Sequence, residues 1–210
     1  MQPSVIRRAS LLLGLLAITV AANACRDKPA HVRTAPAGPA PDSFRVAFQT
    51  TRGYFVVQVW RAWAPKGADR FHDLVAEGFF DGNAFFRVVP EFIAQFGAND
   101  DKALNEQWDA KTIGDDPVTH SNLHGTLVFA AAGPNSRAHQ LFVNLADNKT
   151  LDKQGFAPIG RVVEGQVVAD AIYSGYGESP SYHLLATLGN SYLRRMFPKL
   201  DYIKTVTIIP

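Results

Sequence analysis

The stretch FFRVVPEFIAQFG, residues 85–97, places one arginine, Arg87, among aromatic and β-branched side chains. These residue types favour a β-strand, and a guanidinium buried there without a partner would be very costly. We therefore expect Arg87 either to point outward on the alternating face of the strand or to line a half-open cleft. In a cleft, its permanently charged, rigidly forked donors would be available to a reaction.

Other residue types that often carry catalysis stand in unsuitable contexts. Cys25 is the only cysteine and lies near the N-terminus, and no serine occupies a Gly-x-Ser-x-Gly turn. His120 and His124 are four residues apart, but in an expected loop and without the His-Glu-x-x-His frame of a zinc helix. The adjacent Asp115 and Asp116 are interpreted as solvated surface. We predict no metal site and no cofactor.

Composition favours one globular domain. The chain has 210 residues, of which 47% are hydrophobic and 19% charged, enough for one buried core and too short for two comfortable domains. The formal charge is +2, from 21 basic and 19 acidic residues. Without Arg7 and Arg8, the only charges in residues 1–24, both counts are 19. Nothing here favours nucleic-acid binding.

The N-terminal residues 1–24 have the layout of an export signal. Arg7 and Arg8 precede an apolar run over residues 11–20, and small residues follow. The run is too short for a good transmembrane helix. The alternative, a buried helix of the fold, fits poorly with the Pro- and Ala-rich segment that follows at residues 25–42, which predicts an extended tether. We expect the folded domain to span residues 43–210.

Cys25 would become the first residue of the exported chain. It resembles the lipid-modified cysteine of bacterial lipoproteins, although Ala22 stands where that family usually has leucine. This predicts a protein of the periplasm or cell envelope, anchored to a membrane through a lipid on Cys25. The alternative is simple cleavage that releases a soluble periplasmic protein.

From residue 43 onward, hydrophobic alternation and turn residues predict about eight short strands. We place them in residues 44–50, 53–60, 84–89, 92–97, 125–133, 139–145, 157–163 and 202–209. Helical spacing predicts helices in residues 65–78, 164–175 and 186–197, whereas residues 98–124 look polar and irregular. Such a pattern favours a closed or nearly closed antiparallel barrel capped by helices.

Three ordered segments carry a family resemblance. FFRVVPEFIAQFG, AAAGPNSRAHQLFVNL and LDKQGFAPIGRVVEGQVVADAI resemble, in order and spacing, three motifs of the cyclophilin-type peptidyl-prolyl cis-trans isomerases, across roughly residues 44–175. The remaining C-terminal part is most similar to a bacterial, exported branch of that family. The resemblance implies a mainly-β fold, a closed eight-stranded antiparallel β-barrel capped by two to three helices.

The resemblance also implies roles for individual residues. Arg87 and Gln95 match the catalytic positions: Arg87 would donate to the prolyl nitrogen and Gln95 would orient it and bind the substrate backbone. The matched substrate-binding positions are Phe92, Ile93, Ala130, Ala131, Gln140, Phe142, Leu151 and Phe156.

Three positions depart from the family pattern. Thr150 stands where the family usually has a tryptophan, Phe156 about where it often has a histidine, and Phe86 where a histidine is common. The missing tryptophan argues against tight binding of the cyclic-peptide drug that inhibits many relatives.

These features predict a monomeric isomerase that acts on proline-containing segments of exported proteins and assists their folding. The alternative is a peptide-binding or chaperone module of the cell envelope without significant catalysis, which would not need Arg87. A third interpretation, a purely structural envelope protein, predicts no peptide affinity.

Overall fold

The structure, a computed structural model, describes residue 1 and residues 38–210. The predicted leader, Cys25 and most of the predicted tether lie outside these residues. Within the last described residues of the tether, Ala40 is 6% exposed, and its N–H donates to Asp69 Oδ1 at 2.9 Å. Packing onto the domain therefore begins by Ala40.

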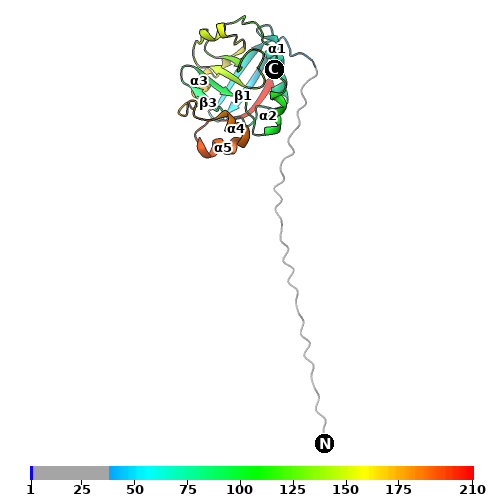
Figure 1. Cartoon of the computed structure of the whole chain (residues 1–210), viewed down its shortest axis with the longest axis vertical. Helices are drawn as coiled ribbons and strands as arrows, with labels where there is room; N and C mark the ends of the chain where they lie inside the picture. The colour runs from blue at the N-terminus through cyan, green and yellow to red at the C-terminus, as the bar shows by residue number, and fades with distance from the viewer. Residues whose placement is uncertain (2–37) are drawn as a thin grey trace. The chain divides into compact units, whose positions relative to one another are not determined.

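Eight strands form one antiparallel sheet, in the order β3-β4-β6-β5-β7-β2-β1-β8 (Figure 1). Their bounds are β1 Ser43–Thr50, β2 Tyr54–Trp60, β3 Arg87–Val89, β4 Ile93–Phe96, β5 Thr126–Phe129, β6 Leu141–Asn144, β7 Pro158–Glu164 and β8 Ile203–Ile209. Each expected strand is present, but most are shorter than their hydrophobic patterns suggested.

The sheet curls into a half-barrel, so the closed barrel that we expected is not confirmed. β3 and β8 are its two edge strands. The residues before β3 approach the start of β8 only through the isolated bridge between Ala84 and Tyr202 and neighbouring backbone hydrogen bonds such as Phe85 N–H to Asp201 O, 3.0 Å. The two aromatic residues that precede β3 point to opposite sides, as successive residues of an extended segment do: Phe85 enters the main core and Phe86 a second cluster.

Helices outnumber the two or three that we expected. The described residues contain α1 Pro65–Ala76, α2 Lys102–Asp109, α3 Gln166–Asp170, α4 Tyr182–Leu188 and α5 Asn190–Met196, with a 3₁₀ helix, η1, at Lys149–Gln154. The third predicted helix is divided at Gly189, whose φ of 65° breaks the helical path. Within the described residues, no helix is both long and apolar enough to cross a membrane.

α2 lies inside the segment that we had predicted to be irregular. Asp101 caps it, because its side chain accepts from the N–H groups of Ala103 and Leu104. Asn105 and Trp108 are its buried residues, and the Arg70 guanidinium lies 4.8 Å from the Trp108 ring. This short helix is held by contacts with distant parts of the chain, which its polar composition concealed.

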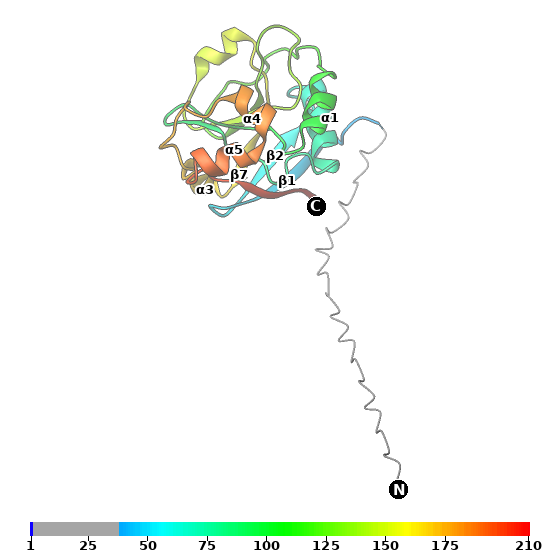
Figure 2. The same cartoon turned by 60° about the horizontal axis from the view of Figure 1, so that its bottom comes forward.

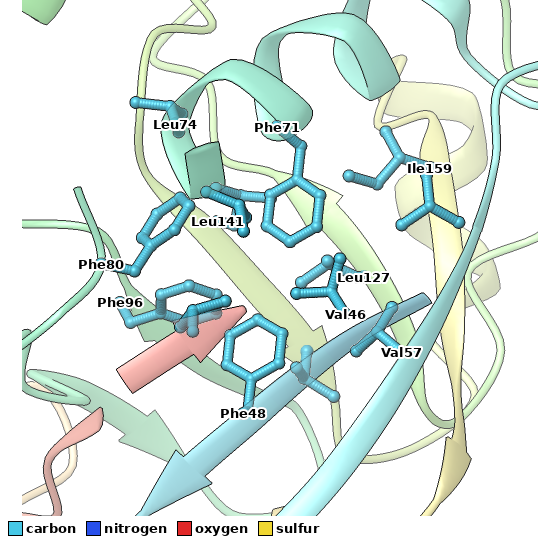
Figure 3. Packing of buried hydrophobic residues seen from close by; sticks show 14 of the residues in the cluster. Val46, Phe48, Val57, Phe71, Leu74, Phe80, Phe96, Leu127, Leu141 and Ile159 are labelled. Carbon is cyan, nitrogen blue, oxygen red and sulfur yellow. The ribbon is translucent and has the colours of Figure 1, made fainter. Parts of the chain in front are cut away.

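The main core lies between α1 and the concave face of the sheet. The ring of Phe71, on α1, points toward Phe48 of β1, with 6.4 Å between their centroids (Figure 3). Phe48 in turn stacks on Phe55 of β2 at 4.7 Å. Aromatic stacking therefore joins the helix to β1 and β2.

A second hydrophobic cluster lies under α4 and α5, which are neighbours on one side of the domain (Figure 2). Its buried members include Phe86, Leu185 and Leu193, and the rings of Phe86 and Tyr182 are 5.9 Å apart. The C-terminal helices therefore pack beside the residue that precedes β3.

The expectation that Asp115 and Asp116 are plain solvated surface is wrong for Asp116. Its side chain is 2% exposed and lies 3.0 Å from Arg137 Nη2, itself on a side chain that is 4% exposed. Asp116 also accepts from the backbone N–H of Gly67 at 2.9 Å and from that of Lys66 at 3.2 Å. One buried carboxylate thus caps α1 and neutralises a buried arginine.

Candidate functional site

The pairing of adjacent strands places the predicted catalytic residues in one row. Arg87 on β3 is opposite Gln95 on β4, and Gln95 is opposite Phe142 on β6. Directly opposed residues project from the same face of a sheet. Register alone therefore brings together side chains from three strands.

Hydrogen bonds continue along this row. Arg87 Nη1 donates to Gln95 Oε1 at 3.2 Å, and Gln95 Nε2 donates to Gln140 Oε1 at 2.9 Å. The Arg87 side chain is 31% exposed, and its guanidinium carbon lies 5.8 Å from the Phe92 ring centroid. Of the two alternatives for Arg87, the half-open cleft is the one observed.

Beside Arg87 is an apolar pocket of about 260 Å³. Ile93, Phe142 and Leu151 belong to its buried cluster, against which Phe92 and Phe156 pack. The pocket is lined by nine of the predicted site residues together with Gln154: Arg87, Phe92, Ile93, Gln95, Ala130, Ala131, Phe142, Leu151 and Phe156. Such a combination of apolar walls and a few convergent polar groups is typical of a ligand pocket.

Gln140 is the predicted residue that does not line this pocket. It lies in an adjoining pocket of about 300 Å³, which shares Gln95, Ala130 and Ala131 with the first. Asp109 and Tyr182 line this second pocket. Burial raises the pKa of the Tyr182 hydroxyl, and the charge of Asp109 raises it further, so the hydroxyl keeps its proton as a donor at neutral pH.

Among the residues around these pockets that sequence reasoning missed are Gln154, Tyr182 and Glu178. Gln154 lies at the end of η1 and lines the first pocket, Tyr182 comes from α4, and Glu178 contacts Arg87. Gln154 lies in a stretch where the match to the family carries an insertion, and the other two reach the site from a distant part of the chain. No local pattern marked any of them.

The positions that depart from the family pattern have different surroundings. Phe156 lies in the wall of the first pocket, with its ring 5.9 Å from that of Phe142. Phe86 is 3% exposed in the second hydrophobic cluster. Thr150 is exposed on η1 and is not among the residues that line either pocket.

The sequence matches a known protein family over much of its length. The family model for cyclophilin type peptidyl-prolyl cis-trans isomerases matches residues 45–184. The chain belongs to this family. Its activity is cis-trans isomerisation of the peptide bond that precedes proline.

Individual relatives agree with this family assignment. The peptidyl-prolyl cis-trans isomerase ppi1 of Schizosaccharomyces pombe is 36% identical over 126 residues, 57% of this chain and 79% of the relative. Peptidyl-prolyl cis-trans isomerase A of Dickeya dadantii is 35% identical over 144 residues, 65% of this chain and 75% of the relative. A crystal structure of a Cryptosporidium parvum cyclophilin type isomerase has the same fold, with a TM-score of 0.61 at 18% identity, covering 80% of this chain and 98% of that one.

The resemblance places Thr150 where many relatives have a tryptophan that helps hold their cyclic-peptide inhibitor. We therefore expect Thr150→Trp to tighten binding of that peptide about tenfold, since a tryptophan would add a large apolar contact and an N–H donor. The measurement is the Kd by isothermal titration calorimetry. Lys149→Trp, at the neighbouring exposed position of η1, is the matched control and should leave Kd unchanged. Equal Kd values for Thr150→Trp and the unmodified protein would show that position 150 does not determine inhibitor affinity.

Proposed function

We propose that Arg87 and Gln95 catalyse the isomerisation, with the proline ring seated in the apolar pocket beside them. The observation that carries this assignment is the position of the Arg87 guanidinium at the edge of that pocket, bonded to Gln95. The proline ring would be surrounded by Phe92, Phe142 and Leu151. Gln140 would contact the part of the substrate that precedes the proline.

The proposed mechanism follows from the electronic structure of the peptide bond. Conjugation of the nitrogen lone pair with the carbonyl gives rotation a barrier of about 18–20 kcal/mol. A hydrogen bond from Arg87 to the prolyl nitrogen favours the pyramidal nitrogen of the twisted state, in which that conjugation is broken. The donor therefore stabilises the transition state more than either planar ground state.

Gln95 would have two roles in this mechanism. Its Oε1 accepts from Arg87 and its Nε2 donates to Gln140, so its amide is fixed at both ends. A fixed neighbour reduces the number of orientations open to the guanidinium. The amide and Gln140 would also offer hydrogen bonds to the substrate backbone.

We also propose that the enzyme belongs to an exported bacterial branch and, as a monomer, assists the folding of exported proteins. The basic start, the apolar run and the small residues before Cys25 support export. A lipid on Cys25 would hold the domain at a membrane through the Pro- and Ala-rich residues 25–42.

Expression of the full chain in a Gram-negative bacterium tests this location. We expect cleavage before Cys25, a lipid-sized mass increase on the new N-terminal peptide, and isomerase activity in the membrane fraction. Cys25→Ser should move the protein out of that fraction. An uncleaved protein in the cytoplasm would contradict export, and cleavage without added mass would contradict the lipid anchor.

A further inference from the structure

Glu178 contacts the Arg87 guanidinium on the side away from Gln95. Its Oε1 accepts from Arg87 Nε–H at 2.7 Å and lies 2.5 Å from Arg87 Nη2. Gln95 Oε1 accepts from Nη1 at 3.2 Å. All three guanidinium nitrogens therefore have a protein partner, and the planar group is held between a carboxylate and an amide.

The backbone that carries Glu178 is fixed to the edge of the sheet. The N–H of Val88, next to Arg87 on β3, donates to Gly177 O at 3.2 Å. Tyr176 packs against the second hydrophobic cluster, with its ring 5.1 Å from that of Phe197. Glu178 is thus the next residue after two anchored positions.

A second anchor lies a few residues earlier. The N–H of Tyr173 donates to Asp201 Oδ2 at 2.7 Å, and Asp201 is 6% exposed. The segment from 173 to 177 is therefore tied to the domain at both of its ends. Glu178 reaches Arg87 from a supported backbone even though its own side chain is 64% exposed.

Such an exposed ion pair contributes little to folding stability. Its geometric effect on a reacting group can be much larger, because misplacing a catalytic group by about 1 Å can reduce a rate about a hundredfold. A charge-assisted contact along one edge of the guanidinium restricts rotation about the long arginine side chain. Arg87 lines the pocket, and the N–H groups that Glu178 and Gln95 do not take up stay available to a substrate there.

We propose that Glu178 is a positioning residue for the isomerase reaction, which holds the Arg87 guanidinium in the orientation that donates to the prolyl nitrogen. This inference rests on the proposed catalytic role of Arg87. The segment between α3 and α4, whose sequence does not suggest a role in catalysis, would then help to position Arg87.

The test compares Glu178→Ala with Glu178→Gln. We expect Glu178→Ala to lower kcat about tenfold with KM and Tm unchanged, because orientation matters in the transition state and not in proline binding. Glu178→Gln keeps an oxygen acceptor for Nε–H and is expected to recover more than half of the lost kcat. An unchanged kcat in Glu178→Ala, or a rise in KM alone, would overturn the proposal, as would a Gln variant no better than Ala.

Glu164→Ala is the matched control. Glu164 pairs with Arg45 on the sheet, and the two side chains are 54% and 34% exposed, close to the 64% and 31% of Glu178 and Arg87. Losing this second surface ion pair should leave kcat unchanged. A similar fall in kcat in both variants would show a general effect of surface charge and would overturn the specific role of Glu178.

Nitrogen-15 NMR of the arginine Nε–H groups gives a readout that does not depend on activity. We expect the Arg87 Nε–H signal, assigned by its loss in Arg87→Lys, to exchange slowly with water in the unmodified protein and rapidly in Glu178→Ala. Unchanged exchange would contradict the positioning contact. If this exchange responds as expected but Arg87→Lys keeps full activity, the catalytic role of Arg87 fails while the contact itself stands.

Discussion

Arg87→Lys should lower kcat/KM for an X-Pro peptide at least about a hundredfold, the usual cost of removing a donor that acts on the transition state. Lysine keeps the charge but replaces the planar fork with a single ammonium. Its three N–H donors radiate from one nitrogen, so they do not reproduce the spacing at which the guanidinium contacts Gln95 and Glu178 and still faces the pocket. The measurement is the cis-to-trans rate of a short peptide, followed by NMR exchange spectroscopy.

The control for this variant is Arg161→Lys, an exposed arginine on β7 that lines neither of the two pockets. It should keep full activity. KM should change little in Arg87→Lys, because the apolar pocket and not the guanidinium binds the proline ring. If Arg87→Lys kept more than about a tenth of the activity with its fold intact, pocket binding alone would account for catalysis.

Asp116→Ala should destabilise the domain by about 3–5 kcal/mol, the typical cost of breaking a buried ion pair by removing one partner. It leaves the Arg137 guanidinium buried, with a side chain that is 4% exposed, and removes the acceptor of the Lys66 and Gly67 N–H groups. Ala64, the N-cap residue of α1, supplies no side-chain acceptor in its place. Urea unfolding followed by circular dichroism measures the loss.

Asp115→Ala is the matched control for this stability effect. Asp115 is adjacent in sequence, but its side chain is 42% exposed and lies 3.7 Å from Arg137 Nε. Its Oδ2 also accepts from the Asn135 N–H at 2.9 Å, but because the carboxylate is exposed, its removal should cost only about 1 kcal/mol, less than the removal of Asp116. Equal losses in the two variants would mean that the buried contacts of Asp116 contribute no more than a surface pair does.

This acidic pair shows what the sequence could not reveal. Two adjacent aspartates in a polar stretch are usually solvated, and only the distant Arg137 and the start of α1 make one of them a buried cap. α2 was missed for a different reason. Its Asp101 cap is a local signal, but the polar composition of the segment led us to expect a loop.

The strands were more predictable because their signal is local. Alternating apolar residues and the turn at Gly53 predicted β1 and β2, which pair from Ser43–Trp60 to Gln49–Tyr54. Whether the sheet closes was not predictable in this way, because it depends on a long-range contact between its two edges, of which the bridge between Ala84 and Tyr202 is part. Local propensity favours a strand over residues 84–89 but does not indicate which distant segment pairs with it.

The pocket residues were predicted as a group because three motifs fixed their order along the chain. The structure places nine of them around one pocket, while their individual roles remain predictions. Glu178 and Tyr182 escaped notice because they act from the C-terminal segment, where the sequence has no spacing that ties them to β3. Residues that support a site from another element are visible only once the chain is folded.

The hydrogen bond from Val88 to Gly177 restricts which chains can pair with the β3 edge of the sheet. β3 is an edge strand, and the unpaired backbone groups of such an edge are a template for strand addition and aggregation. Here the Val88 N–H is already bonded to Gly177, so an extended client cannot extend the sheet at that group. Strand addition at β3 would first have to break this hydrogen bond, so the contact that fixes the backbone before Glu178 also covers part of a sheet edge.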